Sequence, residues 1–172
     1  MGKIAKLAMI LTVFCVIASG SLAFVYLFTQ PKIETNAEKS FEMSLREVLP
    51  VAEIFKAAKC SEGEAYIGIK GDKTVGLAVS VAPRGYSGAI KMLVGINADG
   101  KVIGVKVLDQ RETPGLGANV VKRSFLAQFC GKTVKDEIEP KKDIDAITGA
   151  TISSRAVARG VKEALKTAKE CK

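Results

Sequence analysis

The chain has 172 residues, of which 48% are hydrophobic, and its 26 Lys and Arg residues against 18 Asp and Glu residues give a net charge of +8. This length holds one domain of ordinary size together with an anchor, but not two such domains. The positive charge does not by itself indicate a nucleic-acid partner, because no recognition motif of that class occurs, and solvated lysine faces or contact with anionic membrane lipid account for it.

The N-terminal region carries an uncharged apolar run of 22 residues, Leu7–Phe28. As a helix this run would be about 33 Å long, enough to cross roughly 30 Å of bilayer hydrocarbon. Lys3 and Lys6 precede it, so the positive-inside rule predicts a cytoplasmic N-terminus and an extracytoplasmic remainder, in the inner membrane of the cell. The alternative is a cleaved signal peptide with its small-residue site at Ser21-Leu22-Ala23. The apolar run continues past that site, which favours a retained anchor.

A helical linker region is expected after the anchor. Pro31 should end the anchor helix, because proline lacks an N–H donor and restricts the residue before it. Apolar residues then recur at helical spacing over Glu34–Lys59, interrupted near Pro50, which should start a second short helix. The expected organisation is an anchor over 1–30, a helical linker over 31–60 and a folded domain over 61–172.

The rest of the chain predicts an antiparallel sheet flanked by helices, an α+β pattern. Four segments rich in Val and Ile, and bounded by Gly, Pro and Asp, predict strands: Ala65–Lys70, Thr74–Ala82, Ala89–Asn97 and Lys101–Leu108. A hairpin turn is predicted at Asn97–Gly100. Helices are predicted from about Ala118 to Phe129, with Val121, Phe125, Leu126 and Phe129 buried, and from Ser153 onward, where apolar residues recur every three or four positions.

The chain has no histidine, and its four cysteines stand at positions 15, 60, 130 and 171 without a C-x-x-C pair. The usual ligand patterns of zinc and iron–sulfur sites are therefore missing from the sequence, and no metal is expected. A disulfide between Cys60 and Cys130 could form outside the cytoplasm, although no local feature argues for it. Cys171 is expected at a frayed terminus.

The segment Asp145–Ser154 offers hydroxyl groups to a phosphate just before a helix begins. Gly149 and Ala150 would let the backbone approach closely, and Thr151 would place an alcohol beside the anion. Free N–H groups and the helix dipole favour a phosphate at such an entry. Other hydroxyls nearby are those of Thr148, Ser153 and Ser154. Read alone, T-G-A-T is more simply an N-cap with a tight turn.

Two further loops have a ligand-binding and a plain structural interpretation. Glu112-Thr113-Pro114-Gly115-Leu116-Gly117 could lie flat against an aromatic ring and aim N–H groups at it, or it could simply connect a strand to a helix. An exposed Leu116 would be unusual for a plain connection. Gly85-Tyr86-Ser87-Gly88 is a turn in which Tyr86 could stack on a ring or cover the edge of the core.

Together, Asp145-x-x-Thr148-Gly149-Ala150-Thr151 resembles the flavinylation signature of FMN-binding domains, in which the last threonine carries FMN through a phosphoester bond. The loops Gly85–Ile90 and Glu112–Gly117 resemble two other loops of this family, in the same order. The resemblance covers about Leu45 to Leu165. It extends to the G subunits of Rnf complexes, which are membrane-bound, ion-pumping ferredoxin:NAD oxidoreductases, and more distantly to the C subunits of the sodium-pumping NADH:quinone reductases.

The resemblance implies a single-pass electron-transfer subunit whose extracytoplasmic domain, 61–172, carries covalent FMN on Thr151. A separate flavin transferase would attach FMN from FAD, so the chain would have no catalytic residue of its own. The other membrane and redox subunits of an Rnf-type complex would be its partners. The cofactor contacts that it implies are Tyr86, Ser87, Glu112, Thr113, Gly115, Leu116, Gly117, Thr148, Gly149 and Ala150.

Other interpretations remain open. Asp145 either forms a turn before the helix or is used when flavin is attached. The family often has a histidine near the position of Gln110, and Gln110-Arg111 departs from that pattern, so no imidazole proton relay is expected. The protein could instead be a free-standing flavinylated carrier of another respiratory chain, or a flavin-free assembly or tethering protein.

Overall fold

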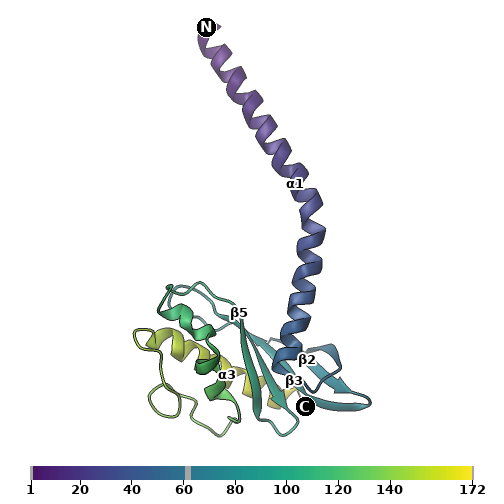
Figure 1. Ribbon diagram of the computed structural model, residues 1–172, viewed down its shortest axis with the longest axis vertical. Coiled ribbons are helices and arrows are strands. Elements are labelled where there is room, and N and C mark those ends of the chain that lie inside the picture. Colours follow the sequence, from purple (N-terminus) through teal and green to yellow (C-terminus); the bar gives the residue numbers. More distant parts are fainter. Residues whose placement is uncertain (1, 61–62, 172) are drawn as a thin grey trace. The chain divides into compact units, whose positions relative to one another are not determined.

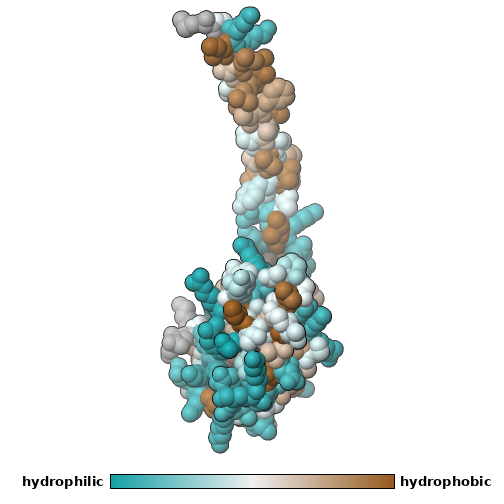
Figure 2. Space-filling model, turned by 90° about the vertical axis from the view of Figure 1, so that its left-hand side faces the viewer, coloured by the Kyte–Doolittle hydropathy of each residue, from teal (hydrophilic) through white to brown (hydrophobic). Residues whose placement is uncertain are grey.

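Helix α1 runs from Gly2 to Val48 in the computed structural model, which describes residues 2–60 and 63–171 (Figure 1). Within these ranges it is the one helix long and apolar enough to cross a membrane. Hydrophobic side chains cover much of the surface near its N-terminal end (Figure 2). The chain divides into two compact units, Met1–Phe41 and Glu42–Lys172, so the last turns of α1 belong to the second unit.

The helix continues through Pro31, and the predicted break at this residue is wrong. Proline removes one intrahelical hydrogen bond and costs about 3 kcal/mol relative to alanine. Each residue on either side adds a further helical bond, so the long helix tolerates this loss. The hydroxyl of Thr35 donates to the carbonyl oxygen of Pro31 at 2.8 Å and supports the same turn.

The second short helix expected from Pro50 is also wrong. A turn follows α1, and the chain then forms strand β1, Ile54–Lys59, which pairs antiparallel with β2. The apolar residues that gave the helical spacing before Pro50, namely Leu45, Val48 and Leu49, are buried in the second unit. Backbone pairing with a neighbouring strand therefore overrides the local pattern after Pro50.

The second unit contains a five-stranded antiparallel sheet in the order β1-β2-β3-β4-β5 (Figure 1). Its other strands confirm the predicted segments with small shifts at their ends: β2 Glu64–Lys70, β3 Lys73–Val81, β4 Lys91–Asn97 and β5 Val102–Asp109. The predicted turn at Asn97–Gly100 is confirmed, because the Gly100 N–H donates to the Asn97 carbonyl at 3.0 Å and Gly100 has φ +80°. Sheet and helices together give the expected α+β fold.

One face of the sheet holds the end of α1 in a furrow of glycines. Gly68 pairs with Gly76, and Gly95 pairs with Gly104. A β-carbon at Gly68 would lie 2.1 Å from Leu49 Cδ2, and one at Gly104 would lie 2.9 Å from Val48 Cα. The missing side chains therefore let Val48 and Leu49 pack directly on the backbone of the sheet.

The other face packs against helix α3, Thr151–Glu170, and the core lies between them. Alternate residues of β4 divide between the two faces, with Val94 and Ile96 in the core beside α3 residues such as Val157 and Val161. This arrangement places the N-terminus of α3 near the loops that leave β3 and β5.

The single helix predicted over Ala118–Phe129 is divided into three short elements. They are η1 Gly117–Val121, α2 Arg123–Leu126 and η2 Ala127–Phe129. Lys122 interrupts them with extended backbone angles, φ −65° and ψ 132°. Phe125, Leu126 and Phe129 are buried as predicted, whereas Val121 is exposed and Val120 takes its place in the core. The interruption at Lys122 changes the helical register, so the predicted buried face does not extend to Val121.

A disulfide joins Cys60, which follows β1, to Cys171, which follows α3. Their Cα atoms are 5.6 Å apart, within the usual range. Cys130 is a free, exposed cysteine, so the Cys60–Cys130 pairing is wrong. Cys171 is therefore tied to the end of β1, and its expected place in a frayed segment is wrong.

Candidate functional site

The three loops singled out in the sequence meet around one cavity of about 590 Å³. The first loop contributes Tyr86, the second contributes Thr113, Leu116 and Gly117, and the third contributes Gly149, Ala150 and Thr151. Ile152 and Ser153 of α3 also line the cavity and were not among the predicted site residues. Helix α3 begins at Thr151, two residues before the predicted start at Ser153, so both residues lie in its first turn.

The expected contacts that do not line the cavity are Ser87, Glu112, Gly115 and Thr148. The Ser87 N–H donates to the Glu112 carboxylate at 3.0 Å. The Gly115 carbonyl oxygen accepts a hydrogen bond from the side chain of Asn119 at 2.8 Å. Glu112 is buried, whereas Ser87, Gly115 and Thr148 are exposed, and the contact of these four residues with a cofactor stays a prediction.

Exposed hydrophobic side chains surround the cavity. Tyr86, Leu116 and Ile152 have exposed fractions of 69%, 46% and 51%. The Leu116 side chain also lies close to the third loop, since a β-carbon at Gly149 would be 3.1 Å from Leu116 Cδ2. Apolar side chains left in contact with water around a cavity favour a ligand with an apolar part.

The start of α3 provides backbone donors to the cavity. Gly149 has φ +76°, a conformation suited to glycine, and the Ala150 N–H donates to the Ile147 carbonyl at 2.9 Å to close the turn. Ala150 is the N-cap residue and provides no side-chain hydrogen bond. The first N–H groups of α3 therefore have no side-chain cap, which suits an anionic ligand at this end of the helix.

The four neighbouring hydroxyls have different environments. Ser153 is buried and donates to the Glu112 carboxylate. Ser154 is buried, donates to the Ala150 carbonyl at 2.9 Å and accepts the Ile147 N–H at 3.0 Å. Thr148 is exposed and does not line the cavity, whereas Thr151 is half-buried and lines it.

Glu112 has a buried carboxylate between the first two loops and α3. Burial raises the pKa of Glu112, but hydrogen bonds from the Ser153 hydroxyl and from the backbone N–H groups of Ser87, Tyr86 and Gly88 outweigh it and hold the pKa below its ordinary value. The carboxylate is therefore ionised at neutral pH.

Two glutamines fix the segments on either side of the site, through contacts that were not predicted. The Gln110 side chain accepts the Glu112 N–H at 2.6 Å. The Gln128 side chain accepts the Asp145 N–H at 2.7 Å and donates to the Asp145 carbonyl at 3.3 Å. The Asp145 side chain itself is exposed. The bonding partners of Gln110 and Gln128 lie two and seventeen residues away, and the periodicity of the sequence does not predict such pairs.

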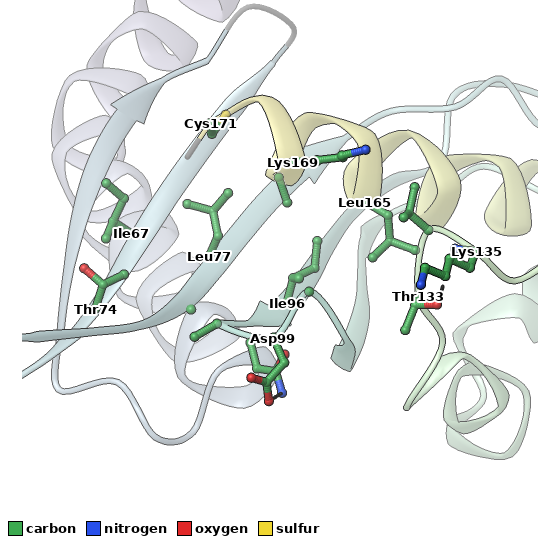
Figure 3. A pocket seen from close by; sticks show the side chains of 16 residues that line it. Ile67, Thr74, Leu77, Ile96, Asp99, Thr133, Lys135, Leu165, Lys169 and Cys171 are labelled. Carbon is green, nitrogen blue, oxygen red and sulfur yellow. Dashed lines mark hydrogen bonds between the residues drawn. The ribbon is translucent and has the colours of Figure 1, made fainter.

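A second cavity of about 590 Å³ lies between α3 and the strands, lined mainly by apolar side chains (Figure 3). Leu165 of α3 and Leu77 and Ile96 of the sheet line it. None of its lining residues belongs to the three loops. We assign the candidate site to the first cavity, because hydroxyls, uncapped N–H groups and exposed apolar side chains meet there.

Two protein-family models match this chain. The FMN-binding domain family matches residues 85–166, which include all three loops, and the RnfG N-terminal region family matches residues 1–48. The crystal structure of Shewanella oneidensis NqrC has a similar fold, with a TM-score of 0.50 and 20% identity. The match covers 67% of this chain and 66%, just under two thirds, of that chain.

Relatives with curated names match over most of the chain. The G subunit of the proton-translocating ferredoxin:NAD(+) oxidoreductase complex of Clostridium ljungdahlii is 39% identical, over 90% of this chain and 86% of its own. The G subunit of the Na(+)-translocating ferredoxin:NAD(+) oxidoreductase complex of Acetobacterium woodii is 34% identical, over 91% and 87%. The G subunit of the ion-translocating oxidoreductase complex of Shewanella oneidensis is 33% identical, over 93% and 87%.

Proposed function

The chain belongs to the family of G subunits of Rnf complexes, and on that premise we propose that it carries FMN as a phosphoester on Thr151 and transfers electrons within such a complex. A separate flavin transferase attaches the cofactor. FMN, when bound, supplies the redox chemistry, while the protein provides position and electrostatics.

The observation that carries the proposal is the environment of the Thr151 hydroxyl. Ser153 and Ser154 are buried and already donate to protein acceptors, and Thr148 lies outside the cavity. Thr151 is the half-buried hydroxyl that lines the cavity at the first residue of α3. Its position supports attachment there in preference to its neighbours.

The surrounding residues fit the two parts of an FMN molecule. The uncapped N–H groups at the start of α3 would hold the phosphate beside Thr151. Leu116, Ile152 and Tyr86 would cover the apolar ring system and exclude water from it. Thr113, which also lines the cavity, has a hydroxyl that can hydrogen-bond to a polar ring edge.

We also propose that the second unit lies outside the cytoplasm, with the N-terminus inside. Lys3 and Lys6 precede the apolar part of α1, which predicts this orientation. The Cys60–Cys171 disulfide supports it, because disulfides persist in oxidising compartments. Protease added to intact spheroplasts should digest the second unit, and protection until lysis would contradict the topology.

Ion translocation is assigned to other subunits of the complex. The apolar run Leu7–Phe28 contains no Asp, Glu, Lys or Arg that could form part of an ion path. The names of two relatives specify different ions, protons and Na⁺, although both are G subunits. This chain therefore contributes an electron-transfer site.

A denaturing gel of the purified membrane protein tests the proposal against its alternatives. Covalent flavin survives denaturation and gives a fluorescent band under ultraviolet light at the position of this chain. A protein co-purified with its complex but without fluorescence would have the flavin-free assembly role. A fluorescent protein that purifies without any Rnf-type subunit would be a carrier of another respiratory chain.

A further inference from the structure

Glu112 connects the three parts of the candidate site through one carboxylate that is only 4% exposed. Its Oε2 accepts the Ser153 hydroxyl of α3 and the Tyr86 N–H at 3.2 Å. Its Oε1 accepts the Ser87 N–H at 3.0 Å. The partners are 25 to 41 residues away in sequence, so the carboxylate joins segments that are distant along the chain.

Glycines in two of the loops leave room for this carboxylate. A β-carbon at Gly85 would lie 2.6 Å from Glu112 Oε1. A β-carbon at Gly117 would lie 3.0 Å from Glu112 Oε2 and 2.8 Å from Ser153 Oγ. The close approach of the buried carboxylate and its partners therefore explains why both positions are glycine, without any ligand.

The negative charge of Glu112 is stabilised without a cation. None of the ion pairs among the described residues includes it. Its acceptors are satisfied by the hydroxyl and N–H donors named above, and the bonded Ser153 lies in the first turn of α3, where the helix dipole favours an anion. The charge is thus held next to a residue that lines the cavity.

We propose that Glu112 is a positioning residue for flavin attachment. Its ionised carboxylate binds the turn at residues 85–88 and the loop at residues 112–117 to the first turn of α3, and so fixes Thr151 and the adjacent N–H groups. Its charge also lowers the reduction potential of a flavin held in the cavity, because a nearby anion opposes the addition of electrons. This inference rests on the proposed role of Thr151.

The test uses the full chain expressed with a flavin transferase, comparing Glu112→Gln with wild type. Glutamine keeps the size but loses the charge and one acceptor oxygen, so attachment should be about ten-fold slower, which corresponds to the loss of a hydrogen bond to a charged group. The midpoint potential of the remaining bound flavin should rise. Glu112→Asp keeps the charge but shortens the reach, so it should slow attachment while changing the potential less.

Glu163→Gln is the matched control, because Glu163 is an exposed carboxylate on α3 outside the cavity and its loss should change neither quantity. Flavin on Thr151 at the wild-type rate and potential in Glu112→Gln would overturn the inference while leaving the proposed function intact. A wild-type chain with no flavin on Thr151 would instead overturn the proposed function.

Ser153→Ala replaces Glu112→Gln if the latter loses its thermal unfolding transition, because Ser153→Ala removes one donor only. Slower attachment in Ser153→Ala would support the inference, and attachment at the wild-type rate would contradict it.

Discussion

Gly95 of β4 lies directly against the carbonyl group of Val48 at the end of α1, so that a β-carbon at Gly95 would be 2.0 Å from that oxygen. No side-chain rotation can relieve such a contact, because the backbone fixes the position of a β-carbon and the Val48 oxygen is itself a backbone atom. The end of α1 that belongs to the second unit is therefore held against the sheet by close packing at Val48.

Gly95→Ala should consequently destabilise the second unit by about 1–3 kcal/mol, the usual cost of overpacking a core. Thermal unfolding of the detergent-solubilised protein, followed by circular dichroism, measures the change. Gly88→Ala is the matched control, since a β-carbon there meets no atom within 4 Å. Equal unfolding temperatures for the two variants would contradict the packing argument.

Asp143 fixes the loop that leads to the candidate attachment site. Its carboxylate accepts the N–H groups of Ile138 at 3.0 Å and Glu139 at 2.8 Å, and it pairs with the ammonium of Lys132 at 2.8 Å. Burial raises the pKa of Asp143, but Lys132 and the two N–H donors outweigh it and lower the pKa to about 2.

Asp143→Asn should therefore cost about 1–3 kcal/mol at neutral pH. Ionised Asp143 stabilises the fold fully at pH values above the ordinary aspartate pKa of 3.8. This stabilisation is lost as the pH falls through the lowered pKa of about 2. Acid unfolding should show a smaller stability change between these pH values in the variant than in wild type. Asp72→Asn, in the exposed turn before β3, is the control. The same acid dependence in wild type and Asp143→Asn would exclude this role.

The Cys60–Cys171 disulfide closes a loop with a sequence separation of 111 residues. Removing it by Cys171→Ser should lower the free energy of unfolding by about 2–5 kcal/mol. A reductant should lower the unfolding temperature of wild type but not of this variant. Cys130→Ser should leave the unfolding temperature unchanged, because Cys130 is a free thiol. A wild type that does not respond to reductant would argue against the bond.

Leu116 should affect the spectrum of the flavin more than its attachment. Its side chain is half-exposed beside the cavity and makes no bond that holds Thr151, so Leu116→Ala should shift the visible absorption or the midpoint potential while the protein remains flavinylated. Val121→Ala removes a similarly exposed side chain that does not line the cavity. Identical spectra for wild type and both variants would leave the loop as a plain strand-to-helix connection.

The predictable parts of this fold are those with local causes. Alternating Val and Ile residues predicted β2 to β5, and the spacing of Val157 and Val161 predicted α3. Strand β1 was missed because its pairing with β2 is decided by tertiary contact. The continuation of α1 through Pro31 was missed because the rest of the helix compensates for a locally unfavourable residue.

The same distinction holds for the site. Short motifs gave most of the residues that line the cavity, since glycines and hydroxyls in a fixed order are visible in the sequence. The bonds of Glu112 to Ser153 and of Gln128 to Asp145 span 41 and 17 residues. No periodicity predicts such pairs. The contact of Glu112 with the cofactor, which the family resemblance implies, stays a prediction, while the bonds of Glu112 to the other loops are visible only in the folded chain.

The assignment of FMN to Thr151 is tested most directly by mass spectrometry of peptides from the mature membrane protein. We expect an adduct of about 438 Da, the mass of FMN less one water, on Thr151, with Thr148, Ser153 and Ser154 unmodified. Thr151→Ala should abolish the adduct and the fluorescence, whereas Thr148→Ala should retain both. Covalent flavin on any other residue, with Thr151 unmodified, would contradict the account.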